Sequence, residues 1–165
     1  MKRYLYLLFF ALAFGSKLYG QSALVKQWDY RFGGTGIENV KCIQVTKDGG
    51  YIIGGSSFSN IGGDKTQANW DTSLTSSDYW IVKTDSLGIK EWDRNFGGTD
   101  GDFLYSVQET TDGGYILGGY SISGIGGDKT QASIGNLDYW IVKTDSLGNK
   151  QWDKDFGGIN DDILL

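Results

Sequence analysis

Residues 78–88 and residues 138–148 read the same, DYWIVKTDSLG, and this duplicated stretch decides the fold. In a β-strand, successive side chains point to opposite faces, so Tyr79 and Ile81 lie on one face and Trp80 on the other. Large apolar groups on both faces predict a strand that is covered on both faces and does not lie on water.

The end of the duplicated stretch predicts a tight turn. In Asp85-Ser86-Leu87-Gly88, the order of residues fits a type I turn, with Asp first to accept backbone hydrogen bonds and Gly fourth. A returning strand follows and holds Trp92. The stretch is therefore the first half of a predicted β-hairpin, and the hairpin recurs with Trp152.

The repeat extends over the rest of the chain. Trp28, Trp92 and Trp152 stand at corresponding positions, 64 and 60 residues apart. Self-similarity over such a period is the signature of a repeat architecture. Other corresponding segments are Phe-Gly-Gly at 32–34, 96–98 and 156–158, Asp-Gly-Gly-Tyr at 48–51 and 112–115, and identical octapeptides at 61–68 and 125–132. The chain is thus divided into the last strand of a preceding unit (24–34), repeat one (35–98), repeat two (99–158) and the start of a third unit (159–165).

Each unit is predicted to hold four antiparallel strands. Asp48-Gly49 favours a primed two-residue turn between the first two strands. There is no proline, and apolar residues nowhere recur at helical spacing over a dozen positions, so the pattern predicts an all-β fold. The predicted strands are residues 39–47, 50–58, 78–84 and 89–95, and then 103–111, 114–121, 138–144 and 149–155.

Four short strands with apolar residues on both faces indicate β-propeller-type blades, which stack face to face. Propellers close with about four to eight blades. Two full repeats therefore predict an incomplete propeller.

The first twenty residues are predicted to be a cleaved signal peptide. Lys2 and Arg3 precede an apolar run at residues 4–14, and a short polar exit ends at Gly20. The run is shorter than the roughly 20 apolar residues of an ordinary membrane span, so an uncleaved anchor is the less favoured alternative. The mature chain is expected to begin at Gln21, to be secreted or held at the cell surface, and to have no membrane span.

Composition argues against several functions. The leader holds three of the 15 basic residues and none of the 20 acidic ones, which leaves 12 basic residues and a net charge of −8. An acidic surface argues against nucleic acid and anionic lipid as partners. Without histidine, the usual catalytic triads cannot form and the commonest metal ligand is absent. Cys42 is the only cysteine, so no disulfide bond can form within the chain. Its counterpart in repeat two is Ser106, which indicates that Cys42 is a small structural residue of a strand. A pair of acidic residues could still serve a glycosidase, but the repeated acids fit turns, so no enzyme activity is expected.

Each unit carries its motifs in one order: DGGYI, GGDKT, DYWIVK, then Trp-Asp and Phe-Gly-Gly. The second strand ends in a glycine pair, Gly54-Gly55 or Gly118-Gly119. In these features the unit resembles the kelch-like, propeller-type repeats of large secreted bacterial proteins, many of them cargo of the type IX secretion system. The resemblance covers essentially the whole mature chain, although repeat one has four extra residues between Ala68 and Asp78. It implies propeller blades and export, and no activity of any residue.

Acidic residues after the Phe-Gly-Gly turns are candidate calcium ligands. Asp100 and Asp102 follow the second such turn, Asp161 and Asp162 follow the third, and Ca²⁺ prefers oxygen ligands of this kind. The first copy keeps only Glu38 there. The preferred interpretation is that these are solvated turn residues, so no cofactor is expected.

The identical octapeptides contain Gly-Asp-Lys-Thr and superficially resemble a phosphate loop. The spaced first glycine is absent and no helix is predicted to follow, so phosphate binding is not expected. Either recent duplication or a shared requirement explains the identity of the two copies.

Trp70 and Asp71 are the candidate ligand-binding residues. Trp70 has no tryptophan counterpart in repeat two and lies in the inserted loop at residues 69–77. An exposed tryptophan at this place is suited to stack on a sugar or a protein. Alternatively, it folds back over its own blade.

These observations predict a secreted repeat scaffold or binding module without catalytic activity of its own, acting in cell-surface adhesion or in glycan or protein binding. The alternative is a fragment of a secreted carbohydrate-active enzyme or of its accessory module. Repeat arrays usually need capping units to cover their terminal faces. The expected partners are therefore further repeats of the same array, or a second copy of the chain.

Overall fold

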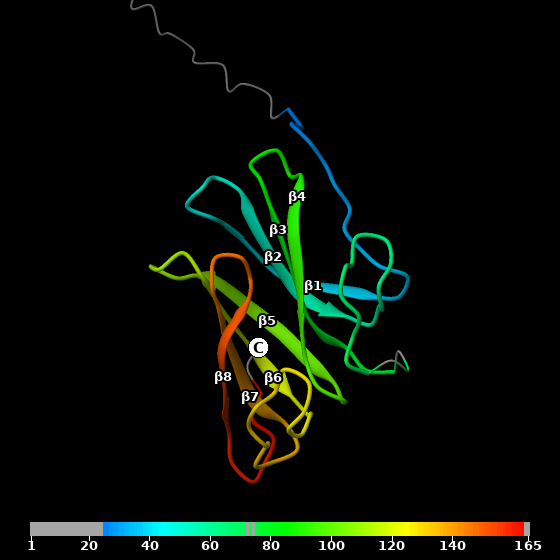
Figure 1. Ribbon diagram of the computed structural model, residues 1–165, viewed down its shortest axis with the longest axis vertical. Coiled ribbons are helices and arrows are strands. Elements are labelled where there is room, and N and C mark those ends of the chain that lie inside the picture. Colours follow the sequence, from blue (N-terminus) through cyan, green and yellow to red (C-terminus); the bar gives the residue numbers. More distant parts are fainter. Residues whose placement is uncertain (1–24, 72, 74, 164–165) are drawn as a thin grey trace, which may run out of the picture.

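The computed structural model describes residues 25–71, 73 and 75–163 of the 165-residue chain (Figure 1). The predicted signal peptide lies outside the described residues. The described part forms eight β-strands and no helix, so the all-β prediction is confirmed. None of these residues belongs to a helix that is long and apolar enough to cross a membrane.

The strands form two four-stranded antiparallel sheets, and in each sheet the strands lie in chain order. This confirms the prediction of four antiparallel strands in each unit, and the predicted bounds agree within one or two residues. The first sheet holds β1 (Glu38–Val45), β2 (Tyr51–Ser57), β3 (Asp78–Thr84) and β4 (Lys90–Phe96), and the second holds β5 (Asp102–Glu109), β6 (Tyr115–Ser121), β7 (Asp138–Thr144) and β8 (Lys150–Phe156).

The two sheets share their register, including its irregularities. The pairing of β1 with β2 shifts between Val40 and Cys42, and that of β5 with β6 shifts between Leu104 and Ser106. Such a bulge leaves one residue unpaired and increases the local twist. Residues of the first sheet can therefore be matched one by one with counterparts in the second.

The turn between β3 and β4 has the predicted form. The Gly88 N–H donates to the Asp85 C=O (3.1 Å), and the Asp85 carboxylate accepts from the N–H groups of Leu87 and Ile89 (2.9 Å each). Gly88 has a φ of +80°, a conformation that a side chain would strain. The same bonds recur in the turn between β7 and β8.

The turn between β1 and β2 differs from the predicted primed turn. The Gly49 N–H donates to the Thr46 C=O, and the Thr46 N–H donates to the Gly50 C=O (2.9 Å each). These bonds make a three-residue loop with Gly49 in the left-handed region, at a φ of +83°. The Asp48 carboxylate selects this form because it accepts from the Thr46 hydroxyl (2.5 Å) and the Gly50 N–H (3.0 Å).

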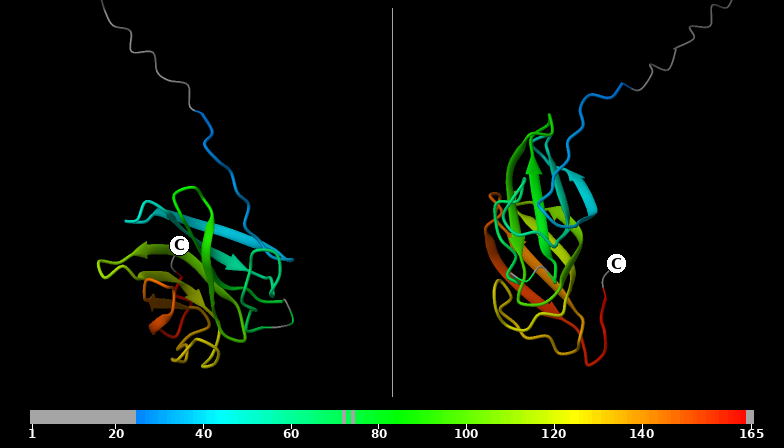
Figure 2. Two further views of the ribbon diagram at one scale, coloured as in Figure 1. Left: turned by 45° about the horizontal axis from the view of Figure 1, so that its top comes forward. Right: turned by 90° about the vertical axis from the view of Figure 1, so that its right-hand side faces the viewer.

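The sheets pack face to face (Figure 2). Their core residues show that they use opposite faces of the repeat unit. We call the face with the tyrosine of DYW the tyrosine face and the other the tryptophan face. The first sheet contributes its tyrosine face and the second its tryptophan face. The core residues are Ile52, Tyr79 and Ile81 from the first sheet and Leu104, Val107, Tyr115, Leu117, Trp140 and Val142 from the second, with Phe96 of β4.

Polar bonds inside the interface fix how the two faces meet. The Tyr79 hydroxyl donates to the Trp140 C=O (3.0 Å), and the two ring centroids are 4.9 Å apart. Nearby, the Ser56 hydroxyl accepts from the Leu104 N–H (3.0 Å). A Cβ added to Gly119 would lie 2.7 Å from the Tyr79 hydroxyl oxygen, so this glycine permits the close approach.

The buried Tyr79 hydroxyl gives a test of the interface. Tyr79→Phe removes the hydrogen bond to Trp140 and should lower the free energy of unfolding by about 1 kcal/mol, measured by urea denaturation. Tyr139→Phe is the matched control because Tyr139 is the counterpart on the half-buried outer face of the second sheet. It should change stability by less than about 0.5 kcal/mol. Equal effects of the two substitutions would contradict the assignment of faces.

Candidate functional site

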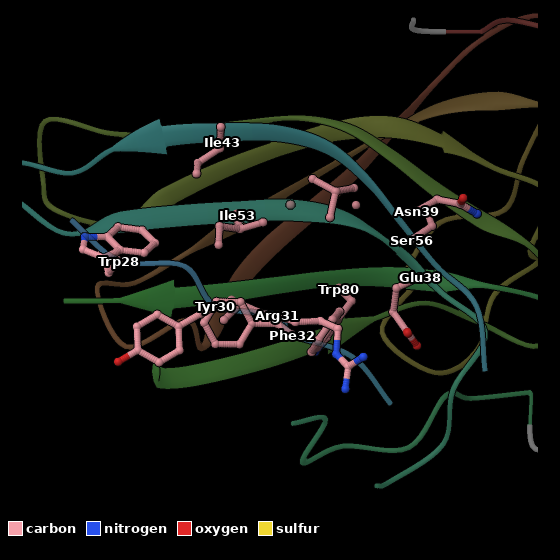
Figure 3. A pocket seen from close by; sticks show the side chains of 14 residues that line it. Trp28, Tyr30, Arg31, Phe32, Glu38, Asn39, Ile43, Ile53, Ser56 and Trp80 are labelled. Carbon is pink, nitrogen blue, oxygen red and sulfur yellow. The ribbon is translucent and has the colours of Figure 1, made fainter. Parts of the chain in front are cut away.

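An apolar pocket of about 430 Å³ lies on the tryptophan face of the first sheet, the face that the second sheet leaves uncovered (Figure 3). Its floor is formed by Ile53, Trp80 and Val82 of β2 and β3. Its wall comes from the segment before β1, which contributes Trp28 and Phe32. The lining is mostly apolar, with Arg31 and Glu38 among the polar residues at its edge.

Residues 28–34, which make this wall, contact the first sheet as β4 contacts the second. The Trp28 ring meets the Tyr51 ring edge-on, with centroids 5.4 Å apart and planes at 68°. The Trp92 ring meets the Tyr115 ring in the same way, at 5.7 Å and 67°. Residues 28–34 therefore stand in the place of an outer strand.

Backbone contacts of this segment match as well. The Asp64 N–H donates to the Gly33 C=O, and the Asp128 N–H donates to the Gly97 C=O (2.8 Å each). The sequence predicted residues 24–34 to be the last strand of a preceding unit. In the described structure the segment takes the position of such a strand, but it pairs with no other strand.

The tyrosine face of the second sheet is also uncovered. One aromatic residue from each strand stands opposite the next across the sheet. The first sheet has polar residues at two of these four positions. The aromatic row is Phe103, Tyr120, Tyr139 and Phe156, and its counterparts in the first sheet are Asn39, Ser56, Tyr79 and Phe96.

The duplicated octapeptides fasten the ends of their own sheets. Lys65 is buried, and its ammonium group donates to the Ser59 C=O (2.9 Å), the Asn69 amide oxygen (2.5 Å) and the Asn95 amide oxygen (2.7 Å). Burial lowers the pKa of Lys65 to about 8. Lys129 makes similar bonds in the second unit. The shared requirement that the sequence left open is therefore a structural one.

A carboxylate at the end of each unit ties the octapeptide to the strands. Asp93 accepts from the N–H (2.9 Å) and hydroxyl (2.8 Å) of Thr66, and from the Trp80 indole N–H (3.0 Å). Asp153 makes the same bonds with Thr130 and Trp140. The motifs GGDKT, DYW and Trp-Asp thus form one connected cluster in each unit.

The candidate residue Trp70 contacts the second unit. Its indole N–H donates to the Asp128 carboxylate (2.7 Å), and a Cβ added to Gly127 would lie 2.8 Å from its ring. Half of the side chain is exposed, beside a pocket of about 180 Å³. The backbone N–H of Trp70 donates to the Asp78 carboxylate, as the backbone N–H of Ile134 donates to the Asp138 carboxylate. Trp70 and Ile134 are therefore counterparts, and the four extra residues of repeat one follow Trp70. Trp70 therefore joins the two units. The sequence analysis predicted either a ligand-binding ring or a ring folded over its own blade, and did not predict this contact.

The other candidate, Asp71, organises its own loop. Its carboxylate accepts from the backbone and hydroxyl of Ser73 and from the hydroxyls of Thr75 and Ser76. These bonds, those of Ser73 first, hold the pKa of Asp71 below its usual range. Both candidate side chains already have partners within the chain.

The candidate calcium ligands do not act together. Asp102 is fully buried and accepts from the Gly98 N–H (2.8 Å) and the Ser123 hydroxyl (3.0 Å). Asp162 accepts from the Gly158 N–H (2.6 Å), whereas Asp100 and Asp161 are exposed. Within residues 25–71, 73 and 75–163, no three acidic, cysteine or histidine side chains are grouped to hold a metal ion.

The carboxyl groups of Asp78 and Asp102 both lie against Gly97, at the joint between the units: a Cβ added to this glycine would lie 2.4 Å from the first and 2.9 Å from the second. Burial raises the pKa of the Asp78 carboxyl to about 6 and that of Asp102 to about 7, and the nearby charge of Asp78 also raises the Asp102 pKa. One oxygen of each carboxyl is buried without a hydrogen-bond partner. Sequence reasoning missed this joint because it expected Asp102 to be a surface residue.

No family model matches the chain, and a search of curated proteins finds no match.

Trp70→Ala should lower the free energy of unfolding by about 1–2 kcal/mol, because it removes a hydrogen bond and ring packing between the units. Urea denaturation measures the change. Ile134→Ala is the matched control, since Ile134 occupies the same backbone position and is largely exposed. A neutral effect of Trp70→Ala would mean that the ring does not join the units.

The buried carboxyls predict greater stability in mildly acidic solution. Their folded-state pKa values, about 6 and about 7, exceed the ordinary 3.8. Their favourable contribution is therefore complete below pH 3.8 and is lost as pH rises through 6 and 7. The urea midpoint should be higher near pH 5 than near pH 7.5.

Asp102→Asn tests the origin of this pH dependence. The substitution keeps the shape and an acceptor oxygen, so it should raise the midpoint at neutral pH and reduce the difference between the two pH values. Asp100→Asn, at an exposed neighbour, should leave that difference unchanged. An unaltered pH dependence in Asp102→Asn would refute the assignment.

Proposed function

We propose that this chain is part of an exported, non-catalytic scaffold of stacked propeller-type blades, whose loops bind glycan or protein at the cell surface. One observation carries the proposal. Two sheets with the same topology and register pack through opposite faces, and each leaves open the face that its counterpart buries. The leader pattern in the sequence supports export.

Contact through unlike faces joins units head to tail. Such a heterologous interface can be repeated and forms a ring if the rotation closes, or an open array if it does not. The open tyrosine face of the second sheet and the open tryptophan face of the first sheet are the two halves of the interface already present between them. Further units of the same type are therefore the partners that fit best.

Sequence differences between the two units support this pairing. Where a residue on one half of the interface changes between the units, the residue that it meets on the other half changes as well. Between the sheets, the Lys47 N–H donates to the Glu109 carboxylate (2.7 Å), and the Lys47 ammonium group is 3.8 Å from it. The counterparts on the two open faces are Thr111 and Val45, so no charge is left unpaired when those faces meet.

Size differences are matched in the same way. Ser56 meets Leu104 between the sheets. On the open faces the counterparts are the larger Tyr120 and the smaller Val40. Compared with the buried pair, the residue on the open tyrosine face is larger and the residue on the open tryptophan face is smaller, so the two changes in size compensate each other.

The roles of the acidic residues support a non-catalytic module. The repeated carboxylates accept hydrogen bonds in turns, as Asp48 and Asp85 do, or at the joint between the units, as Asp78 does.

The open faces predict concentration-dependent association of the mature chain, measured by light scattering. Ile43→Lys places a charge on the open tryptophan face, where Ile43 is 61% exposed, and should reduce association. Ile61→Lys is the matched control, because Ile61 is equally exposed on an octapeptide loop. A monodisperse monomer at all concentrations would count against stacking.

A further inference from the structure

We propose that the small pocket beside Trp70 binds one pyranose ring of a neutral glycan. This inference rests on the proposed function, in which loops of the scaffold bind glycan or protein, and it names both the ligand class and the place of binding. The pocket has a volume of about 180 Å³ and lies where the two units meet. Its lining residues are Gln67, Ala68, Trp70 and Asn95 from repeat one and Asp128 from repeat two.

The Trp70 ring provides a flat apolar wall that is held in place before any ligand arrives. Its backbone N–H donates to the Asp78 carboxylate (2.9 Å), and its indole N–H donates to the Asp128 carboxylate (2.7 Å). Gly127 lies against part of the ring, yet half of the side chain is exposed. A pyranose presents C–H groups on one face, and the electron-rich face of an indole attracts such groups. A ring that is already fixed loses little freedom on binding.

The Gln67 side chain provides a donor whose orientation is set. Its amide oxygen accepts from the backbone N–H of Asn95 (2.8 Å). Only the oxygen of an amide can accept this bond, so the position of the NH₂ group follows from it. Among the described residues this NH₂ group has no acceptor, and the side chain is exposed. It is therefore available to a hydroxyl group of a ligand.

The Asp128 carboxylate provides an acceptor on the other side of the joint. One oxygen accepts from the indole N–H of Trp70 and from the Gly97 N–H (3.3 Å). The other oxygen accepts no hydrogen bond from the part of the chain that the structure describes. Hydroxyl groups both donate and accept, so the hydroxyls of one sugar can donate to Asp128 and accept from Gln67. An apolar wall with a few convergent polar groups is the ordinary make-up of a small-molecule site.

Size and charge restrict the ligand. The pocket is smaller than the roughly 300–1,000 Å³ of pockets for drug-sized ligands, so it suits a single ring. An anionic sugar would meet the Asp128 carboxylate on a mature chain that carries a net charge of −8. The favoured ligand is therefore a neutral sugar.

The second unit lacks the aromatic wall and serves as an internal comparison. The amide oxygen of Gln131 accepts from the Asp155 N–H (2.8 Å), as that of Gln67 accepts from Asn95. Ile134 stands at the place of Trp70. The oriented amide is thus present in both units, and the ring is present only in the first.

The test is a titration of the mature chain with the methyl glycosides of glucose, galactose, mannose and N-acetylglucosamine, and with glucuronate as the anionic comparison. Proton–nitrogen correlation spectra follow the tryptophan indole N–H groups. At least one neutral sugar should give a saturable shift of the Trp70 signal, which is assigned by its absence in Trp70→Ala. The signal of Trp152, which is 43% exposed and lies outside the pocket, should not shift. Glucuronate should not bind.

Matched variants make the test specific. Gln67→Glu keeps an oxygen for the Asn95 N–H but loses the NH₂ donor, and should weaken binding roughly five- to tenfold. Gln131→Glu introduces the same charge at the corresponding position and should leave binding unchanged. Trp70→Ala should abolish binding, whereas Ile134→Ala should not. Thermal melting of Gln67→Glu at the native temperature shows that its fold is retained.

Two results would overturn the pocket and leave glycan binding by the scaffold intact: a sugar that binds without shifting the Trp70 signal, or equal weakening by Gln67→Glu and Gln131→Glu. Tighter binding of glucuronate than of every neutral sugar would overturn the ligand class. If no neutral sugar binds, the inference fails. Association through Ile43, measured by light scattering, then decides separately whether the proposed scaffold stands.

Discussion

The structure depends on one constraint, which is that every sheet is apolar on both faces and must be covered twice. The duplicated strand shows this directly. All seven residues of β3 are buried, whereas Tyr139 and Ile141 of β7, which carries the same sequence, are only half-buried. The difference arises from position alone. β3 is covered on one face by the second sheet and on the other by residues 28–34, whereas β7 is covered on one face only. Identical strands thus differ in burial according to what covers them.

Within each unit, polar side chains connect the strands to the loops. The octapeptide contributes a buried lysine and a threonine, the Trp-Asp motif contributes Asp93 or Asp153, and the DYW strand contributes an indole N–H. Burying a charge is unfavourable unless it is paired and hydrogen-bonded. The Asp93 carboxylate meets that condition through the threonine, the indole N–H and Lys90. Lys65 meets it through the Ser59 carbonyl oxygen and two asparagine amide oxygens. Loss of the threonine or of the indole removes hydrogen bonds from a buried carboxylate, so the three motifs depend on one another.

Sequence reasoning predicted the elements well because their signals are local. Alternation, glycine positions and the Asp85 turn fix strands and hairpins within a few neighbouring residues. The predicted turn type at Asp48 was wrong, because the Asp-Gly pair alone does not show the hydrogen bonds that the Asp48 carboxylate accepts from Thr46 and Gly50. Contacts between units were missed for the same reason, since nothing near Trp70 indicates that its indole meets Asp128, and Asp102 looks like a turn residue. The pocket was not predicted, because Val40 and Ile43 lie in a strand whose sequence does not show that one of its faces is uncovered.

A heterologous interface also carries information about the order of units. Each unit presents one half of the interface on its tyrosine face and the other half on its tryptophan face. In the proposed array, a change on one half is compatible only with a change in the next unit; between the two sheets, the small Ser56 meets the larger Leu104. A lysine at the place of Thr111 would lack the acid that Glu109 supplies to Lys47. In the proposed array, units that look interchangeable in sequence are therefore specific for their neighbours, and the few interface positions at which the two copies differ set this specificity.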